Sequence, residues 1–579
     1  MKSLLIVVTS ISLGMVVGCK KSQVVKPAPV PPAAPGTPPI TAMPTEPVIA
    51  NTIGFFLNDW VPKTYTAPAY TAATPPAESS SATVTINVAN VITKIPQAIF
   101  GNNANSWMTQ MVTEAPLMAY LTNYHSHVIR FPGGSISDIY FWNKPANTAP
   151  SDAPENRVDE NGNTVPGNYW FGRILDSWTI SLDNYYTMLT QTGNQGMITV
   201  NYGYARYGTS ANPAAAAAHL AADWVRYDNG RTKYWEVGNE NFGTWEAGYR
   251  INTANNADGQ PQLLNGKIYG EHFKIFADSM RRAAIEKGKT IYISAVLMEK
   301  APASYIPSNL QTWNADVMSK AGNTPDYYSV HSYFTPYKQN SDPATILSSV
   351  IPEEATIMNY VKASVTAVAG ISQKPVALSE WNIFAEGSAQ QTSYINGIHG
   401  LMVMGEALKN KFGMAARWDL ANGWNDGNDM GLFNIGDEPG VSKWNARASY
   451  YYMYYFQKTA GDRLVESTIT GNTAVKSYAS TYSTGEAAVT LVNTSSSLQI
   501  VTVNFQNFAP TGRYYWYVLT GGTDNGVFSK NVLVNGSGSS IGSGGPADYQ
   551  TLNAWSSGVS SGVKISLPAF GVASMMFDK

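Results

Sequence analysis

The chain has 579 residues, of which 44% are hydrophobic and 12% aromatic, so it can bury a large core and exceeds one ordinary domain. Lys and Arg (38) nearly balance Asp and Glu (40), which gives a formal net charge of −2 at pH 7. A nucleic-acid-binding surface needs clustered basic residues, so we expect no nucleic-acid partner. Few charges and many aromatic side chains suit a surface that meets neutral sugars, and equally a well-packed exported protein.

The first residues are typical of an exported lipoprotein. After a short basic start, residues 4–17 are apolar but too few to cross a membrane comfortably. They lead to Cys19, the single cysteine of the chain, and resemble the lipobox at which bacterial lipoproteins are cleaved and acylated. We predict a signal peptide over residues 1–18 and a lipid anchor on Cys19. Lys20 in the next position favours the outer membrane of a Gram-negative bacterium; the alternative is an ordinary secretory signal.

Residues 19–81 are predicted to form a proline-rich tether. Residues 20–50 are rich in Pro, Ala, Val and Thr, with too few large apolar side chains to fold alone. A second Pro/Ser/Thr-rich stretch covers residues 68–81. Between them we expect an anchoring segment that packs on the folded body through Phe55, Phe56, Trp60 and Tyr65.

Short apolar runs alternate with helical patterns from residue 97 to residue 459. The helices carry end signals, such as Asn212 followed by Pro213 at one start and Gly288 at one end. Alternating strands and helices predict a parallel sheet, and eight repeats predict a catalytic (β/α)8 TIM barrel. The alternative is an open doubly wound sheet, but no glycine-rich phosphate loop follows the first strand. The predicted strands are Ala98–Asn102, His127–Phe131, Met197–Tyr202, Lys233–Gly238, Thr290–Val296, Tyr327–Tyr333, Pro375–Ser379 and Ala415–Leu420.

Beyond residue 460 the helical patterns stop, and strand patterns separated by Gly, Ser and Asn take over. They predict a C-terminal antiparallel β-sandwich over residues 460–579. An alternating apolar pattern starts ahead of the barrel, so we expect residues 82–96 to form a strand that joins this sandwich. The predicted strands are Val475–Thr481, Ala487–Val492, Ile500–Phe505, Tyr514–Leu519 and Val563–Ser566, with the last continuing to Phe570.

Two glutamates follow predicted barrel strands. Glu240 lies in Gly238–Asn241 (Gly-Asn-Glu-Asn) after the fourth strand, and Glu380 lies in Ser379–Asn382 (Ser-Glu-Trp-Asn) after the seventh. Barrel active sites lie at the C-terminal strand ends, so these carboxyl groups can face each other across the mouth. Glycoside cleavage needs two such groups, one to protonate the leaving oxygen and one to attack the anomeric carbon or activate water. A lone glutamate is usually a solvated surface charge, but both of these flank apolar strands.

These motifs resemble those of the large clan of retaining glycosidases. Arg130–Gly134 (Arg-Phe-Pro-Gly-Gly) after the second strand resembles the Arg-Tyr-Pro-Gly-Gly of family 51, which contains α-L-arabinofuranosidases and endoglucanases. The resemblance covers roughly residues 82–579. It implies that Glu240 is the general acid/base and Glu380 the nucleophile.

The same resemblance implies roles for neighbouring residues. Asn239 would hydrogen-bond the sugar hydroxyl beside the anomeric carbon, and Arg130 would hold Glu380 ionised, with a structural salt bridge as its alternative role. For the histidine and for each aromatic side chain, packing in the core is the competing interpretation. The further residues predicted to bind substrate are His331, Tyr333, Trp381, Trp418, Asn102 and Trp107, with Trp245 and Trp424 in outer subsites.

One departure from family 51 affects the predicted substrate. Its arabinofuranosidases carry a sugar-binding glutamate after the first strand, where Phe100–Trp107 has no acidic residue. We predict a retaining hydrolase of plant-type cell-wall polysaccharide, most similar to an α-L-arabinofuranosidase. The alternatives are an endo-acting β-glucanase and a non-catalytic glycan-binding surface lipoprotein.

We expect no cofactor and no catalytic metal, because the sequence has no His-Glu-x-x-His pair and no cysteine cluster. The expected partners are a polysaccharide or oligosaccharide substrate and, through the N-terminal lipid anchor only, a membrane.

Overall fold

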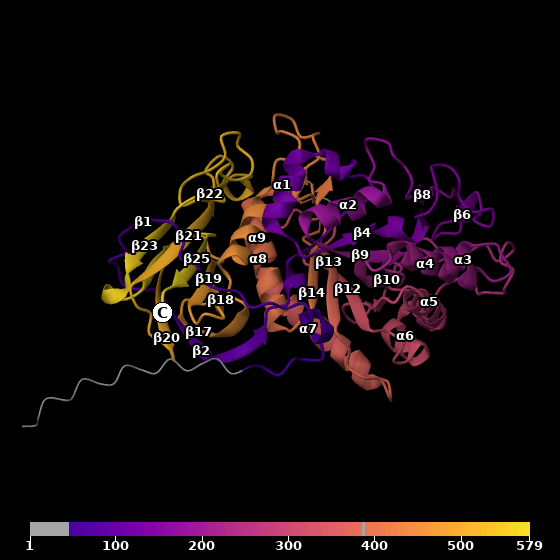
Figure 1. Ribbon diagram of the computed structural model, residues 1–579, viewed down its shortest axis with the longest axis horizontal. Helices are drawn as coiled ribbons and strands as arrows, with labels where there is room; N and C mark the ends of the chain where they lie inside the picture. The colour runs from indigo at the N-terminus through magenta and orange to yellow at the C-terminus, as the bar shows by residue number, and fades with distance from the viewer. Residues whose placement is uncertain (1–45, 385–387, 426, 428) are drawn as a thin grey trace, which may run out of the picture. The chain divides into compact units, whose positions relative to one another are not determined.

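Figure 1 shows a computed structural model of the chain, in which a barrel wrapped by helices lies beside a sheet-rich part. The structure describes residues 46–384, 388–425, 427 and 429–579. The predicted signal peptide and Cys19 lie outside the described residues. Among the described residues, no helix combines the length and the apolar character that crossing a bilayer requires.

The predicted (β/α)8 barrel is confirmed. Eight parallel strands close in the order β10-β11-β12-β13-β14-β3-β4-β9. Most of their residues are buried, as expected for strands with a filled interior on one side and helices on the other. The strands are β3 (Gly101–Asn103), β4 (Val128–Phe131), β9 (Gln195–Val200), β10 (Thr232–Val237), β11 (Tyr292–Val296), β12 (Tyr327–Tyr333), β13 (Val376–Asn382) and β14 (Met414–Arg417).

A helix follows each barrel strand, and the predicted end signals hold. The side chain of Asn212 accepts a hydrogen bond from the backbone N–H of Ala215 and caps α4, and Gly288 has φ +62 just beyond α5. The helices are α1 (Ala115–Tyr124), α2 (Leu182–Thr192), α3 (Tyr204–Tyr207), α4 (Pro213–Asp228), α5 (Gly266–Glu286), α6 (Trp313–Ala321), α7 (Pro343–Ala367), α8 (Tyr394–Lys409) and α9 (Ala448–Thr459).

The first barrel strand begins later than predicted. Residues Gln97–Phe100 form a 3-10 helix, η2, and β3 covers only Gly101–Asn103. The apolar side chains that suggested a strand are buried, but they reach the core from a helical turn. A short apolar run does not distinguish the two conformations, so the strand end was placed one residue too early.

The C-terminal β-sandwich is confirmed, and it takes in strands from ahead of the barrel. Strand β2 pairs antiparallel with β17 and parallel with β20, and β1 pairs parallel with β23, so the sheet is not purely antiparallel. Residues 70–72, predicted as tether, are therefore an edge strand, because backbone pairing does not need apolar side chains. The first strands are β1 (Tyr70–Ala72), β2 (Ala82–Lys94), β17 (Arg463–Gly471), β18 (Val475–Thr481) and β19 (Ala487–Asn493).

The end of the sandwich differs from the prediction. Strand β24 stops at Leu567, and a turn at Pro568, which cannot donate to a sheet, leads to a separate last strand, β25. Strands β17, β22, β23 and β25 had not been predicted. The remaining strands are β20 (Gln499–Gln506), β21 (Arg513–Gly521), β22 (Val532–Val534), β23 (Ala554–Gly558), β24 (Lys564–Leu567) and β25 (Val572–Phe577).

The sandwich packs on the barrel through helices α8 and α9. One set of alternating side chains fills its own core, while Tyr478, Tyr517 and Met576 belong to the cluster shared with the barrel. Contact with α8 is very close, because a Cβ added at Gly405 would lie 2.4 Å from the Tyr478 ring. Glycine at this position lets the helix and the sheet meet.

The segment ahead of the sandwich strands closes the base of the barrel. Ile53 and Phe56 are buried among residues at the starts of the barrel strands, including Val128 and Tyr234. Phe55 stacks on Tyr292 with ring centroids 3.8 Å apart. The segment therefore acts as a plug, which we define as residues 50–57 with the 3-10 helix η1 (Gly54–Leu57).

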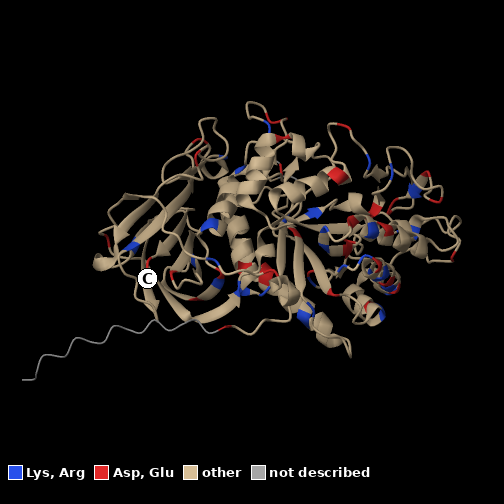
Figure 2. Ribbon diagram, viewed as in Figure 1, with Lys and Arg blue, Asp and Glu red and all other residues tan. Residues whose placement is uncertain are grey.

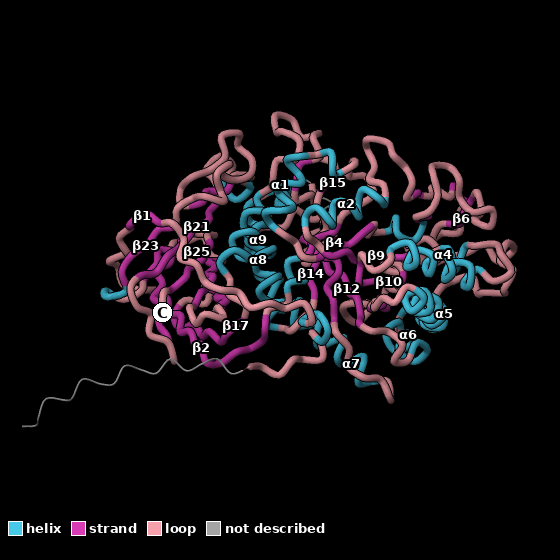
Figure 3. The backbone as a smooth tube through the Cα atoms, in the orientation of Figure 1, coloured by secondary structure: helices cyan, strands magenta, loops and turns pink. Residues whose placement is uncertain are grey.

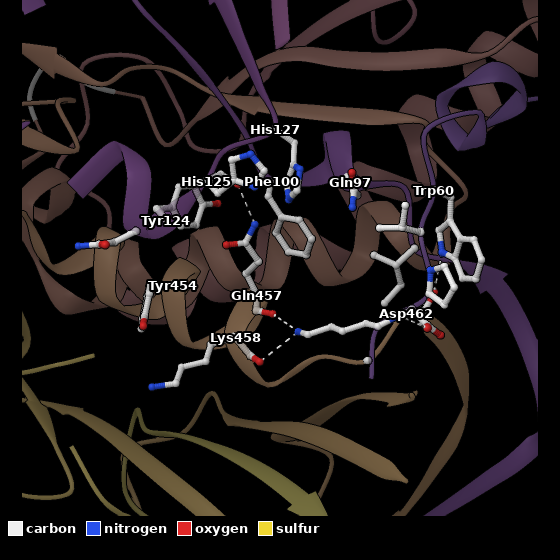
Figure 4. A pocket seen from close by; sticks show the side chains of 16 residues that line it. Trp60, Gln97, Phe100, Tyr124, His125, His127, Tyr454, Gln457, Lys458 and Asp462 are labelled. Carbon is white, nitrogen blue, oxygen red and sulfur yellow. Dashed lines mark hydrogen bonds between the residues drawn. The ribbon is translucent and has the colours of Figure 1, made fainter. Parts of the chain in front are cut away.

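A cavity of about 420 Å³ lies between the residues after the plug, the barrel base and α9 (Figure 4). Lys63 extends along it and donates from Nζ to the backbone carbonyls of Gln457, Lys458 and Ala460 at 2.6–3.1 Å. Burial lowers the pKa of Lys63 to about 8, against the opposing charge of Asp462. This cavity lies at the N-terminal strand ends, the side of a barrel that usually serves stability.

Long loops gather along the upper edge in Figure 3. The connection from β4 to α2 runs from Pro132 to Ser181, and Figure 2 shows acidic and basic residues interspersed over the barrel helices. The loops hold three small sheets, β5 (Tyr140–Phe141) with β8 (Trp170–Phe171), β6 (Asn156–Val158) with β7 (Thr164–Pro166), and β15 (Ala421–Asn422) with β16 (Phe433–Asn434). The other 3-10 helices are η3 (Met111–Thr113), η4 (Ser135–Ile139), η5 (Ser308–Leu310), η6 (Ala389–Thr392), η7 (Gly526–Phe528) and η8 (Val559–Ser561).

Candidate active site

The barrel brings Glu240 and Glu380 together at the C-terminal ends of its strands. Glu380 lies near the end of β13, Glu240 follows β10, and His331 lies on β12. One carboxylate oxygen of each glutamate and one ring nitrogen of His331 lie within 4.8 Å of one another. The two carboxyl groups are thus close enough to act on the same small group of atoms.

A strained turn presents Glu240. Gly238 has φ +78 and Glu240 has φ +42, a conformation that costs a non-glycine residue roughly 1–3 kcal/mol. A Cβ at position 238 would lie 2.0 Å from Oδ1 of Asn241, so the turn requires glycine there. Asp138 holds the turn, since it accepts hydrogen bonds from the backbone N–H of Asn239 and the side chain of Asn241.

Arg130 is the centre of the network beneath the glutamates. Its buried guanidinium donates from Nη1 to Glu380 at 3.0 Å and from Nε to Glu236 at 2.7 Å. It also donates to Oδ1 of Asn239 at 2.8 Å and Oδ1 of Asn103 at 3.0 Å. Arg130 therefore holds Glu380 and Asn239 in fixed positions relative to each other.

Glu236 balances part of the charge of Arg130. It is completely buried and accepts hydrogen bonds from Thr199 and Ser379, both at 2.9 Å. Burial opposes its ionisation, but Arg130 and His331 outweigh that cost and hold the pKa of Glu236 below its ordinary value. We had not predicted this residue. The signal was present, because a charged residue inside the apolar strand β10 is rare unless it is paired.

Glu380 receives a hydrogen bond on each carboxylate oxygen. Tyr333 donates to Oε1 at 2.7 Å, opposite the Arg130 contact on Oε2. Burial and the nearby Glu240 raise the pKa of Glu380 above its ordinary value, although His331 and Arg130 act in the opposite direction. Both donors bind the ionised form, so the carboxylate is held in one orientation with its charge supported.

His331 lies between the two glutamates. Its Nδ1 is 2.9 Å from Oε1 of Glu240 and 3.9 Å from Oε2 of Glu380. Burial disfavours the charged ring, but Glu380, Glu236 and Glu240 together raise the pKa of His331 to about 10. A ring with this pKa is protonated at neutral pH, and its Nδ1 faces the carboxyl groups of both glutamates.

A second acidic pair supports Asn239 from behind. Glu246 accepts hydrogen bonds from the side chains of Asn239 at 2.9 Å and Ser135 at 2.8 Å. Burial, together with the charges of Asp138 and Glu240, raises the pKa of Glu246 well above its ordinary value. Burial also raises the pKa of Asp138 to about 7, despite four hydrogen bonds that act against it. This layer, which we had not predicted, carries less negative charge than its carboxyl groups suggest.

Glu240, His331 and Glu380 are also a donor set of metal-ligand type. A metal ion would need the neutral imidazole, because a protonated ring nitrogen has no lone pair to donate.

The glutamates open into a cavity of about 910 Å³. Among the predicted site residues, those that line it are Trp107, Asn239, Glu240, His331, Tyr333, Glu380, Trp418 and Trp245. Trp418 follows β14 and packs on the Gly133–Gly134 turn, where a Cβ at either glycine would lie 2.8 Å from its ring. Sequence reasoning missed further lining residues on the surrounding loops, including Phe242, Tyr305, Tyr337 and Phe384.

Two predicted binding residues point elsewhere. Trp381 is completely buried near α8, because successive side chains of a strand alternate and Glu380 takes the inward direction. Asn102 is also buried and donates to Oγ of Ser126, while Asn103 takes the place in the Arg130 network. Both predictions were therefore wrong, the second because β3 extends one residue further. Trp424 is not among the residues that line the cavity.

Two features of the fold and site occur together. A closed (β/α)8 barrel carries paired carboxyl groups at its mouth, and a β-sandwich takes strands from both sides of the barrel in the chain. Solved structures of glycoside hydrolases share this fold. No protein-family model matches the chain, and no curated protein matches it.

Several solved structures share this fold at low sequence identity. A family 51 α-L-arabinofuranosidase from Bifidobacterium longum has a TM-score of 0.61 and 15% identity, covering 87% of this chain and 100% of its own. A thermostable family 51 α-L-arabinofuranosidase from Thermotoga petrophila gives 0.60 and 15%, covering 86% and 100%. A family 44 endoglucanase from Clostridium thermocellum gives 0.53 and 11%, with the same coverage of 86% and 100%.

Proposed function

We propose that this chain is a retaining glycoside hydrolase that acts on plant-type cell-wall polysaccharide. The observation that carries the proposal is the pairing of Glu240 and Glu380, whose nearest oxygens lie within 4.8 Å at the barrel mouth. Retaining enzymes hold their two carboxyl groups about 5–5.5 Å apart, whereas inverting enzymes leave room for a water molecule between them, at about 6.5–9.5 Å.

The surroundings of Glu380 and Glu240 indicate which is the nucleophile and which is the general acid/base. The Glu380 carboxylate, fixed by Arg130 and Tyr333, attacks the anomeric carbon while the glycosidic C–O bond breaks. Glu240, whose side chain is 17% exposed against 6% for Glu380, gives its proton to the leaving oxygen. Glu240 then takes a proton from water, whose oxygen displaces Glu380 from the anomeric carbon. Asn239, oriented by Arg130 and Glu246, is placed to donate to the neighbouring sugar hydroxyl.

The stereochemistry of azide rescue tests this assignment. In Glu240→Ala, azide can enter beside the glycosyl-enzyme, so the glycosyl azide should keep the substrate configuration. In Glu380→Ala, azide should replace the nucleophile and give the inverted configuration. NMR of the azide products from an activated aryl glycoside distinguishes the two.

Glu466→Gln, on the sandwich strand β17, is the matched control and should keep full turnover. Unchanged activity in Glu380→Ala would overturn the proposal. Glycan binding without turnover in the unaltered protein would instead support the non-catalytic alternative.

Two modes of action remain within this proposal. Structural likeness to family 51 arabinofuranosidases supports release of terminal arabinose. The cavity favours the second mode, endo-acting cleavage of a β-glucan, because its volume is about 910 Å³ and it is lined by Trp245 and Tyr305, which are 57% and 84% exposed. The loop after β3 also lacks the acidic residue that family 51 arabinofuranosidases use to bind the sugar.

Product analysis separates these modes. The protein is incubated with arabinan, arabinoxylan, mixed-linkage β-glucan and xyloglucan, and the products are resolved by anion-exchange chromatography. Release of arabinose alone supports the exo-acting arabinofuranosidase, while a ladder of oligosaccharides supports the endo-acting enzyme.

We also propose that the protein is exported and lipid-anchored through Cys19, with the outer membrane of a Gram-negative bacterium as its site. The proposal is supported by the apolar stretch that ends at this single cysteine. Labelling with a fatty-acid analogue should mark the full-length protein and should be lost in Cys19→Ala, and retained labelling in that variant would contradict it.

A further inference from the structure

Four tryptophans form a continuous row that leads away from the glutamate pair. Trp107 contacts Trp418 and Trp170, with ring centroids 6.5 and 6.3 Å apart, and Trp170 contacts Trp178 at 5.8 Å. All three contacts are edge-to-face, with interplanar angles of 63–72°. Such contacts fix each ring relative to the next, so the row is built before any ligand arrives.

The row begins inside the cavity and ends in solvent. Trp418 and Trp107 line the cavity, whereas Trp178 is 53% exposed. Trp178 lies in the connection from β4 to α2, beside Leu175, which is 79% exposed. Long connections of this kind in a barrel are commonly functional, and this one holds an indole half in water at the end of a packed row.

A second aromatic group lies on the Glu240 side. Trp245 and Tyr305 line the same cavity from the loops after β10 and β11, and they are 57% and 84% exposed. Among the tryptophans in the described part of the chain, Trp178 and Trp245 are the two that are more than half exposed. The exposed indoles therefore belong to groups associated with different sides of the reacting centre.

The proposed reaction indicates which part of the substrate lies beside each aromatic group. Glu240 protonates the leaving oxygen, so the leaving sugars extend toward the loop that carries Trp245. Trp418 follows β14, the neighbour of the strand that carries Glu380, so the tryptophan row extends from the side of the nucleophile. Arg173 pairs with Asp183 at 2.6 Å near the row, and Lys300 pairs with Glu353 at 3.1 Å near Tyr305, so neither cation is left free for an anionic polymer.

We infer that the cleft binds several sugars of an uncharged polysaccharide with a linear backbone of pyranose rings, on both sides of the bond that it cleaves. Trp107, Trp170 and Trp178 bind sugars on the non-leaving side, and Trp245 with Tyr305 binds the leaving side. Pyranose rings present flat C–H faces that stack on indoles, and the ring centroids of the row are 5.8–6.5 Å apart. This inference rests on the proposed glycoside hydrolase function and adds the aromatic residues that hold the polymer on each side.

The test compares a polymer with a short substrate in the same protein. The polymers are mixed-linkage β-glucan and xyloglucan, and the short substrates are 4-nitrophenyl β-cellobioside and 4-nitrophenyl α-L-arabinofuranoside. Trp178→Ala should lower the ratio of kcat/KM on the polymer to that on the short substrate about five- to tenfold, mainly through KM. Trp178→Phe, which keeps an aromatic face, should recover most of that ratio.

Tyr70→Ala is the matched control, because Tyr70 is a 46% exposed aromatic residue on the sandwich edge strand β1. It should leave the ratio unchanged, and thermal unfolding should show that every variant is folded. An unchanged ratio in Trp178→Ala, or release of single sugars only by the unaltered protein, overturns the inference while leaving the glycosidase proposal intact. Failure of the unaltered protein to cleave any of the four substrates counts against both.

Discussion

Glu236 does not line the cavity, yet Arg130 depends on it for charge balance. Breaking a buried ion pair from one side leaves the other charge uncompensated and typically costs about 3–5 kcal/mol. Because Arg130 keeps Glu380 as a second partner, we expect Glu236→Gln to lose about 3 kcal/mol of unfolding free energy. Activity should fall with it, since Arg130 also orients Asn239. Urea denaturation and initial rates measure the two effects.

Glu286→Gln is the control for that experiment, because Glu286 pairs with Arg226 at the surface, where its side chain is 53% exposed. Solvent screens such a pair, so the unfolding midpoint should not move. A loss in Glu236→Gln no larger than in this control would contradict the role assigned to Glu236.

His331 should remain protonated far above neutral pH. Its neighbouring carboxylates raise its pKa to about 10, whereas burial beside Arg417 lowers the pKa of His399 to about 3. Histidine-selective NMR should therefore show a charged ring for His331 and a neutral ring for His399 at pH near 7. Two neutral rings would contradict the charged bridge between the glutamates.

The same shift has a consequence for stability. A histidine whose pKa rises on folding stabilises the protein fully below its unfolded pKa, near 6.5, and loses that contribution as the pH approaches the folded value. The stability gap between the unaltered protein and His331→Asn should thus narrow from about pH 6.5 to about pH 10. Urea unfolding of both proteins at several pH values measures this gap, and a gap of constant size would contradict the raised pKa.

At the scale of elements, helix α8 provides a matched pair of glycines. A Cβ at Gly405 would lie 2.4 Å from the Tyr478 ring, whereas at Gly400 the nearest atom is a Trp381 ring carbon at 3.4 Å. Gly400→Ala should gain up to about 1 kcal/mol of stability from helix propensity, and Gly405→Ala should lose stability because the sheet must move. Thermal unfolding of both variants decides this, and equal effects would contradict the close contact.

The plug gives a second prediction at this scale. Phe56 is 4% exposed at the base of the barrel, so Phe56→Ala should cost about 3–5 kcal/mol by leaving a cavity. The turnover of the folded variant should be unaffected, because the glutamates lie at the other strand ends. Val61→Ala, at a 57% exposed side chain nearby, is the control and should change neither quantity.

Helices and strands were predictable from the sequence where a single pattern, such as an apolar run or a helix cap, marked them clearly. The barrel strands were recognised because they are buried apolar runs alternating with capped helices. Strand β25 was missed because both of its faces are buried, so Val572–Phe577 shows no alternation. Edge strand β1 was missed because its three residues are exposed and show no apolar pattern, and it is placed by pairing with the distant strand β23.

Sequence motifs were sufficient to predict those site residues that lie within the motifs. Glu240, Glu380, Asn239 and Arg130 lie in local runs whose chemistry is visible in the sequence. The acidic residues behind them, Glu246 and Asp138, come from two different loops. Only the folded chain brings them to Asn239 and its turn. No local sequence pattern predicts such a long-range contact. A one-residue error in the end of β3 was also enough to assign the site position to Asn102 instead of Asn103.

At the scale of the whole molecule, the barrel and the sandwich share one hydrophobic cluster. Tyr517 of β21 packs against Tyr455 of α9 with ring centroids 4.9 Å apart. We therefore expect residues 46–579 to unfold in a single cooperative transition, followed by tryptophan fluorescence and by circular dichroism. Two separated transitions would show that the two parts are stable independently.

The plug at the base of the barrel gives the two ends of the barrel different tasks. The described chain begins beside β2 and β17, where Glu46 pairs with Lys94 and Arg463, and then closes the base. The glutamates and their cavity lie at the other ends of the same strands. A polymer can therefore enter the cleft without displacing the segment that holds the base closed.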